Sequence, residues 1–157
     1  MIVVGIDPGI TGAVAIVSTE DEGREPVVFS PELFKHRGKN RISETWFWDR
    51  LRSLPDNHYV VIEEQSPRPG EGSVGAFTSG WNTAVYYVAA KMHGSRIVWV
   101  QPATWKKHFG LINADKEASR ATAKELFPSL TGSLSAKAHH GRAEALLIAW
   151  WGKQTIK

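Results

Sequence analysis

The chain has 157 residues, of which 42% are hydrophobic, a length sufficient for one well-buried domain spanning 1–157 and short for two. The absence of cysteine excludes disulfides, thiol catalysis and cysteine-ligated zinc, so oxygen and imidazole groups remain as metal ligands. No apolar run is long enough to span a bilayer and no signal-type segment opens the chain, so we expect a cytoplasmic protein without a membrane partner. The formal net charge of +3 permits a polyanionic partner without requiring one.

The N-terminal stretch "MIVVGIDPGITGAVAIVS" predicts a hairpin that opens the fold. Residues 2–6 are apolar and mostly β-branched, Pro and Gly follow, and 13–17 resume the strand pattern. A short third strand is expected at 27–29, and the basic stretch "KHRGKNR" after it is predicted to be a loop. Ser43 then opens "SETWFWDRLRSL", whose spacing predicts a capped amphipathic helix.

The middle of the chain predicts a buried strand, a loop and a long helix. The apolar run from Tyr59 to Ile62 in "HYVVIEEQ" lacks alternation, which is typical of a central strand buried on both faces. The segment "SPRPGEGS" is expected to be an irregular loop. A helix should run from about Val74 to Met92 and stop at Gly94, with Gly80 inside it leaving room for close approach.

The C-terminal third adds a strand, "RIVWV", and three helices. "PATWKKHFG" predicts a short helix, and "NADKEASRATAKELFP" predicts another with Asn113 or Asp115 as its cap and Pro128 as its stop. "SLTGSLSAKAHH" is expected to be a flexible lead into a last helix from about His140 to Trp151, which is apolar on nearly every side and therefore interior. This order predicts an α/β fold with a mixed sheet flanked by helices.

Three acidic residues occupy boundaries of buried elements. Asp7 ends the first strand, Glu63 ends the fourth, and Glu144 lies at the start of the last helix. Each alone has an ordinary explanation: turn chemistry before Pro-Gly, a solvated strand end, or a carboxylate favoured by the helix dipole. Together they indicate a site for a hard cation such as Mg²⁺ or Mn²⁺, because burying a carboxylate is costly without a partner. Glu64 points to the opposite side of its strand from Glu63.

His140 precedes Glu144 by four residues. Side chains at this spacing share one face of a helix, so the two could converge on one ligand. The alternative is that His140 is a solvated neighbour of the helix cap.

Basic residues could flank the same acidic cleft. Lys116, Arg120 and Lys124 recur every four residues and predict one stripe on the penultimate helix. Lys106 and Lys107 follow Trp105, and Arg68 lies in the Pro-Gly loop. Such a stripe is often only a solvated helix face, but beside an acidic pocket it favours contacts to a phosphate backbone.

Five segments, in this order, resemble RuvC-type Holliday junction resolvases, particularly the phage-encoded branch: "GIDPGITGAVAIV", "VVIEEQSPRPGEGS", "PATWKKHFGL", "DKEASRATAKELFP" and "HGRAEALLIA". The resemblance implies a ribonuclease-H-like fold with a mixed five-stranded sheet, a homodimer, and cleavage of four-way junctions and other branched DNA. It would place a phage-encoded protein in the host cytoplasm. Asp7, Glu63 and Glu144 match the acids of the family.

The implied mechanism is phosphodiester hydrolysis with two Mg²⁺ or Mn²⁺ ions per active site, leaving a 5′ phosphate and a 3′ hydroxyl. Asp7 would bridge both ions, and Glu63 and Glu144 would each hold one. His140 stands where relatives of this branch carry an aspartate, so it is expected to serve as a ligand or to act on the attacking water, with His139 as the alternative. The family's aromatic wedge is missing, because "QSPRPG" offers only Arg68 between prolines.

Two other functions are compatible with the sequence. "GIDPGITG" also resembles the phosphate loop of the sugar-kinase and actin-like ATPases, although those need two lobes around the nucleotide. The chain would then be a single-lobe nucleotide-binding module. The other alternative is a non-catalytic DNA-binding module in which the acids are structural.

Overall fold

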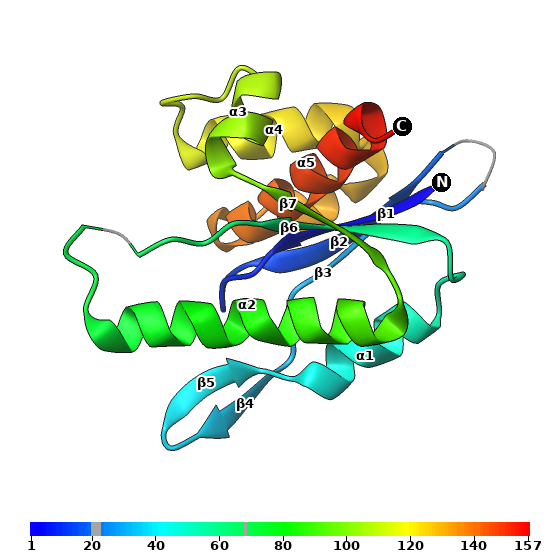
Figure 1. Ribbon diagram of the computed structural model, residues 1–157. Helices are drawn as coiled ribbons and strands as arrows, with labels where there is room; N and C mark the ends of the chain where they lie inside the picture. The colour runs from blue at the N-terminus through cyan, green and yellow to red at the C-terminus, as the bar shows by residue number, and fades with distance from the viewer. Residues whose placement is uncertain (20–22, 68) are drawn as a thin grey trace.

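The computed structural model describes residues 1–19, 23–67 and 69–157, and in these ranges a five-stranded sheet forms the centre of the molecule (Figure 1). The strand order is β3-β2-β1-β6-β7. β1 pairs antiparallel with β2 and parallel with β6, and β6 pairs parallel with β7. The strands are β1 (Ile2–Asp7), β2 (Ala13–Ser18), β3 (Val27–Phe29), β6 (His58–Glu63) and β7 (Arg96–Val100). The predicted mixed sheet is confirmed, and the strands that end in Asp7 and Glu63 are neighbours in it.

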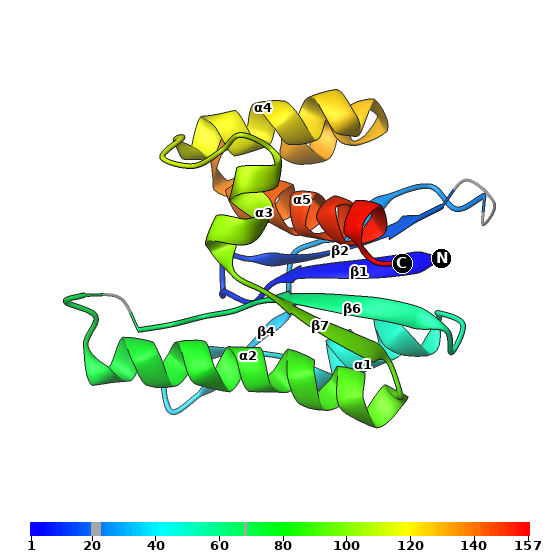
Figure 2. The ribbon, with the colours of Figure 1, turned by 45° about the horizontal axis from the view of Figure 1, so that its top comes forward.

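Helices cover both faces of the sheet (Figure 2). On one face lie α1 (Glu44–Arg52) and α2 (Ser73–His93), and on the other lie α3 (Pro102–His108), α4 (Lys116–Leu126) and α5 (His140–Thr155). In the described ranges, no helix is long and apolar enough to cross a membrane.

The alternation of side chains along β1 decides which helices it contacts. Ile2, Val4 and Ile6 belong to the core beneath α1 and α2, whereas Val3 belongs to the core shared with α5. Gly5 faces α5 as well, and a Cβ atom there would collide with the backbone of Ala145 and Ala149. Helix α5 therefore lies directly on β1, and the next residue on this face is Asp7.

The stretch "KHRGKNR" is a hairpin, so the prediction of a loop is wrong. β4 (Leu33–His36) pairs antiparallel with β5 (Lys39–Ile42), and His36 lies opposite Lys39 across a two-residue turn. Arg37 and Gly38 both have positive φ, of 48° and 74°, which suits a tight hairpin turn. The strands carry many polar residues and little apolar alternation, which is why the pattern did not indicate them.

Several predicted helix boundaries are confirmed. The Trp46 N–H donates to Oγ of the expected cap Ser43 at 3.3 Å, and α2 ends at Gly94 with a φ of 82°. The cap of α4 is Asp115 rather than Asn113, since its Oδ1 accepts the Ala118 N–H at 2.9 Å.

The region before and within the last helix is more ordered than expected. The stretch predicted as a flexible lead forms short 3-10 turns that enclose the fully buried Leu134. These turns are η2 (Pro128–Leu130), η3 (Gly132–Leu134) and η4 (Lys137–His139). α5 also continues four residues past Trp151, to Thr155.

Candidate functional site

The sheet brings Asp7 and Glu63 to the same edge. β1 and β6 are parallel neighbours in which Ile6 pairs with Ile62, so their carboxyl ends meet. Val61 belongs to the core shared with α5. Glu63 comes two residues later in the same strand, and residues two apart share a face of the sheet. Both acids therefore lie on the side covered by α5, whose first turns carry Glu144.

The charges of Glu63 and Glu144 both act on Asp7. Its pKa is raised to about 7, first by burial and then by the negative charges of Glu144 and Glu63. The Gly9 N–H, 3.4 Å from Asp7 Oδ1, and the charge of Lys106 act in the opposite direction. A carboxyl group that titrates near neutrality among other acids is stabilised in its charged form by a bound cation.

Glu63 is held by two side-chain donors. Its exposed fraction is 7%, and burial raises its pKa. The Trp105 indole N–H donates to Oε2 at 2.7 Å, and the Gln65 amide donates to Oε1 at 3.0 Å. Both bonds favour the carboxylate and lower the pKa. They also fix the orientation of the carboxylate at the end of β6.

Trp105 is a site residue that the sequence did not reveal. In the sequence it stands beside two lysines in a short helix, where apolar packing is the ordinary role of tryptophan. The available signal was its donor group, since a buried indole N–H normally needs an acceptor. The structure shows Trp105 fully buried with Glu63 as that acceptor.

Tyr86 also lies in the electrostatic field of the site. It is fully buried on α2, and its hydroxyl has no hydrogen-bond partner among the described residues. Burial raises its pKa, and the charge of Asp7 raises it further. The hydroxyl therefore stays protonated beneath the acidic edge.

The carboxylate oxygens of the site are the ligand type that Mg²⁺ and Mn²⁺ prefer. However, no group of three or more His, Asp or Glu side chains within the described ranges is arranged so that it could hold a metal ion. Mutual repulsion among the acids opposes such an arrangement, and the same repulsion adds to burial in raising the pKa of Asp7. The donor chemistry thus fits a divalent cation, while the coordination geometry is not formed.

The two histidines before Glu144 have different local contacts. His139 Nδ1 accepts the Ala136 N–H at 3.4 Å, and burial is the main cause that lowers its pKa. His140 begins α5, and its Nδ1 lies 3.4 Å from the Lys137 carbonyl oxygen. His139 therefore contacts the turn that precedes α5, whereas His140 lies one turn before Glu144, as the sequence predicted.

Lys106 is the basic residue whose charge acts on the acids of the site. Its charge lowers the pKa of both Asp7 and Glu63, and its Nζ lies 5.3 Å from the centre of the Trp105 ring. Lys107 and Lys116 are exposed and Lys124 is half-buried.

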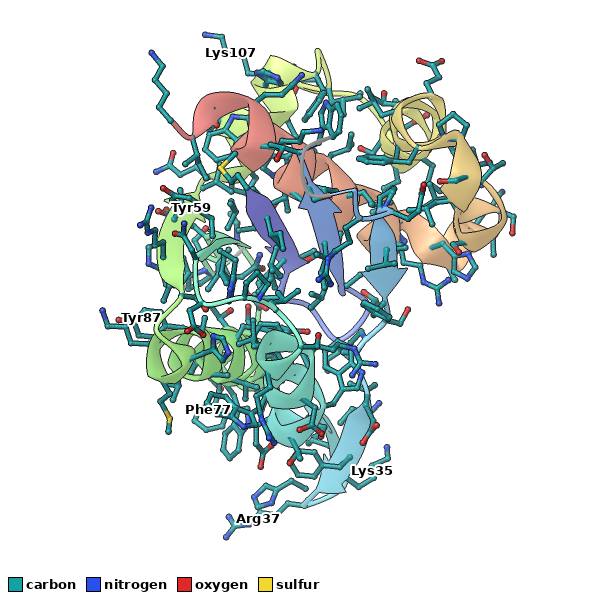
Figure 3. All side chains as sticks on the ribbon, turned by 90° about the vertical axis from the view of Figure 1, so that its right-hand side faces the viewer. Lys35, Arg37, Tyr59, Phe77, Tyr87 and Lys107 are labelled. Carbon is teal, nitrogen blue, oxygen red and sulfur yellow. The ribbon has the colours of Figure 1, made fainter. Side chains whose placement is uncertain are left out.

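Basic side chains also occur far from Lys107. Figure 3 shows Lys107 at one end of the molecule and Lys35 and Arg37, on the hairpin, at the other.

Arg120 does not belong to an exposed stripe, and that prediction is wrong. Its exposed fraction is 7%, and its guanidinium donates to the carbonyls of Leu134 and Ser135 and to Glu117. These bonds attach the 3-10 turns to α4, so we withdraw Arg120 as a DNA contact. Arg68, the other arginine predicted to bind DNA, lies outside the described residues.

Comparisons with known proteins identify the fold. No family model matches the chain. The structure of T. thermophilus RuvC in complex with Holliday junction substrate matches 99% of this chain and 96% of that chain, with a TM-score of 0.65 and 20% identity. The chain has the RuvC fold. A second Thermus thermophilus RuvC structure matches 95% of the chain and 91% of its own length, with a TM-score of 0.51 and 24% identity.

A curated relative adds similarity in sequence. The chain is 38% identical over 94 residues, or 59% of its length, to the protein named Holliday junction resolvase MOC1, chloroplastic, from Chlamydomonas reinhardtii. The match spans 11% of that relative. The expected α/β fold with a mixed five-stranded sheet flanked by helices is confirmed.

Proposed function

We propose that this chain is a metal-dependent endonuclease that resolves four-way DNA junctions and cuts other branched DNA. The observation that carries the proposal is the gathering of Asp7, Glu63 and Glu144, from three separate elements, at one edge of a RuvC fold. The similarity to a protein named as a Holliday junction resolvase supports it.

The reaction would be hydrolysis of a phosphodiester. The oxygen of a water molecule forms a bond to phosphorus, the bond from phosphorus to the 3′ oxygen breaks, and that oxygen takes a proton. The products carry a 5′ phosphate and a 3′ hydroxyl. Two bound Mg²⁺ or Mn²⁺ ions would supply positive charge that activates the water and stabilises the leaving oxygen.

The acids and their neighbours have distinct roles in this proposal. Asp7 interacts with both other acids, so Asp7, Glu63 and Glu144 are the residues that would hold the metal. The hydrogen bonds from Trp105 and Gln65 favour the charged form of Glu63 and orient its carboxylate. His140 acts either as a further ligand, one better suited to Mn²⁺ than to Mg²⁺, or as the group that accepts a proton from the water.

Lysines around the site would hold the DNA backbone. Lys106 stands beside the acids, where it can contact the phosphates next to the cleaved bond. Lys107, Lys116 and Lys124 are the further proposed phosphate contacts. Arg68 remains a predicted contact on sequence grounds. Phosphate contacts of this kind position DNA without reading its sequence.

We propose that a second copy of the chain covers the outer face of α2. This face exposes Val74, Phe77, Trp81, Val88 and Met92, whose exposed fractions range from 37% to 74%. Such a stripe of large apolar side chains is unusual on a monomer. A homodimer would present two active sites to opposed strands of one junction. If the protein sediments as a monomer at micromolar concentration and still resolves junctions fully, the proposed homodimer is refuted.

Gly80 contributes open space rather than a close contact within the chain. Nothing lies within 4 Å of the position that a Cβ atom would take there.

The cellular compartment stays a prediction, because the sequence favours the cytoplasm whereas the relative carries a chloroplast name.

The test is incubation of the purified protein with labelled junction, duplex and single-stranded DNA, with and without Mg²⁺ or Mn²⁺. We expect paired nicks in the junction that require the metal. Binding of the junction without any cleavage would favour a non-catalytic DNA-binding module. ATP binding or hydrolysis in place of DNA cleavage would favour the nucleotide-binding alternative.

A further inference from the structure

Tyr86 carries a buried donor that the proposed mechanism does not use. It is fully buried on α2, and its ring packs edge-on against Phe47 with 4.8 Å between ring centres. Its hydroxyl has no hydrogen-bond partner among the described residues, and a buried hydroxyl without a partner costs free energy. Phenylalanine would fill the same space without this cost, so the hydroxyl indicates a polar role.

The course of α2 beside β6 brings this part of the helix beneath the acidic edge (Figure 1). His93, the last residue of α2, lies beside His58, the first of β6, with 5.2 Å between ring centres. Asn82 comes eleven residues before His93, or about 16 Å along the helix. Glu63 comes five residues after His58, or about 16 Å along the strand, so Asn82 and Glu63 lie at the same level.

Tyr86 follows Asn82 by about one turn on the same face of α2. Side chains of a helix point back toward its N-terminus, so the Tyr86 ring extends toward the level of Asn82. Asn82 lines a cavity together with Gly9, whose N–H donates to Asp7. Burial raises the pKa of the Tyr86 hydroxyl, and the charge of Asp7 raises it further. Position and charge thus both place the hydroxyl beneath Asp7, on the side opposite to α5.

Asp7 is held less firmly than Glu63. Glu63 accepts hydrogen bonds of 2.7 and 3.0 Å from Trp105 and Gln65. In the described part of the chain, Asp7 accepts a single hydrogen bond, from a backbone N–H at the long distance of 3.4 Å. Carboxylates that ligate metals are normally oriented by donors behind them. The Tyr86 hydroxyl is a donor of this kind for Asp7.

We propose that Tyr86 is a positioning residue for Asp7: its hydroxyl donates through one bound water molecule to the Asp7 carboxylate and holds it in the orientation that binds a divalent cation. This water has Tyr86, Asp7 and the Asn82 side chain as polar partners, and three is the number that a buried water typically has. Asn82 is itself fixed, because its Oδ1 accepts the Ile42 N–H at 3.4 Å. The inference rests on the proposed nuclease function, because it concerns how that site holds its metal.

The test measures Mn²⁺ binding to the purified protein by calorimetry, without DNA, in the wild type and in Tyr86→Phe. Loss of the donor should weaken Mn²⁺ binding by roughly 10–100-fold, the usual effect of losing a group that orients a metal ligand. Single-turnover cleavage of a four-way junction by Tyr86→Phe should need a correspondingly higher Mn²⁺ concentration. Binding of the junction should stay as in the wild type.

Two control variants separate the hydroxyl from packing. Tyr87→Phe removes the same atom from the next residue, which is 38% exposed, and should bind Mn²⁺ as the wild type does. Phe47→Leu loosens the packing around the Tyr86 ring but keeps its hydroxyl. It should lower the unfolding temperature and leave Mn²⁺ binding nearly unchanged.

The unfolding temperature of Tyr86→Phe gives a second reading that does not depend on metal. Removing a buried hydroxyl that serves no partner should leave the fold as stable as the wild type or more stable. Removing one that is bonded to a water and to Asp7 should leave it less stable, because the water and the carboxylate then lose a donor.

The outcomes separate this inference from the function on which it rests. A Tyr86→Phe variant that binds Mn²⁺ and cuts junctions like the wild type would overturn the role of Tyr86 alone. If Phe47→Leu weakens Mn²⁺ binding as much as Tyr86→Phe does, packing explains the effect and the role of Tyr86 is again overturned. Wild-type protein that neither binds Mn²⁺ nor cuts any junction would overturn the nuclease function as well.

Discussion

Replacing Trp105 by phenylalanine tests how the site controls its second acid. The substitution removes the indole N–H that donates to Glu63 Oε2 at 2.7 Å. Glu63 is buried and already has a raised pKa, which this hydrogen bond lowers. Its loss should therefore raise the pKa of Glu63 further. A larger fraction of Glu63 would be protonated, and so unable to bind a cation, at a given pH.

The size of the effect follows from the kind of bond that is lost. A hydrogen bond to a charged group contributes about 1.5–3 kcal/mol, which corresponds to a pKa shift of at most about one to two units. We therefore expect the acid limb of the pH–rate profile for junction cleavage to move to higher pH by up to that amount. At a pH below the pKa that Glu63 has in the wild type, cleavage should fall by up to about 10- to 100-fold relative to wild type.

The assay is single-turnover cleavage of a labelled junction over a range of pH. Trp99→Phe is the matched control, because Trp99 is 41% exposed and its ring lies 5.6 Å from that of Tyr87, at the edge of the sheet. Phenylalanine is smaller than tryptophan, so Trp105→Phe also loses packing contacts. That loss would lower the stability of the fold but would not move the pH–rate profile. An unchanged profile in folded Trp105→Phe would refute the role given to this hydrogen bond.

Three further predictions concern other residues. Lys106→Ala should weaken binding to all DNA structures alike and reduce the slope of log affinity against log salt by about one; a lost sequence preference with an unchanged slope would contradict this. His140→Ala should lose cleavage and keep DNA binding. His140→Asp should stay active, and metal titration should show its preference shifted toward Mg²⁺. If His139→Ala alone loses cleavage, His139 is the ligand or proton acceptor instead. Burial lowers the pKa of His58, so the neutral ring favours folding and its contribution to the free energy of unfolding should fall as the pH drops below 6.5. A His58→Gln variant whose unfolding temperature changes with pH as that of the wild type does would show that His58 contributes nothing.

The sequence predicted the features that follow from apolar patterning. Strands and helices with a buried face appeared at nearly the expected residues, and Asp7 and Glu63 stood out because each ends an apolar strand. Parallel pairing of those strands then brings the two acids together without further information. The position of Glu144 follows in the same way from an interior helix that begins just before it.

Features that depend on polar contacts between distant segments were not predictable in this way. Arg120 repeats at helical spacing with two lysines, yet it is buried because the carbonyls of the 3-10 turns accept its hydrogen bonds. The β4–β5 hairpin contacts α2 through Arg41, which donates to Thr78 and lies over the Trp81 ring. Neither contact leaves a periodic pattern in the sequence.

The most direct test of the proposed metal-dependent cleavage compares Glu63→Gln with Glu64→Gln. Glu63 is buried beside Trp105, whereas its neighbour Glu64 is exposed. With Mg²⁺ and a labelled four-way junction, Glu63→Gln should bind the junction as wild type does and fail to cut it, and Glu64→Gln should cut normally. Normal cleavage by Glu63→Gln, or loss of cleavage in Glu64→Gln alone, would contradict the acidic site described for this fold.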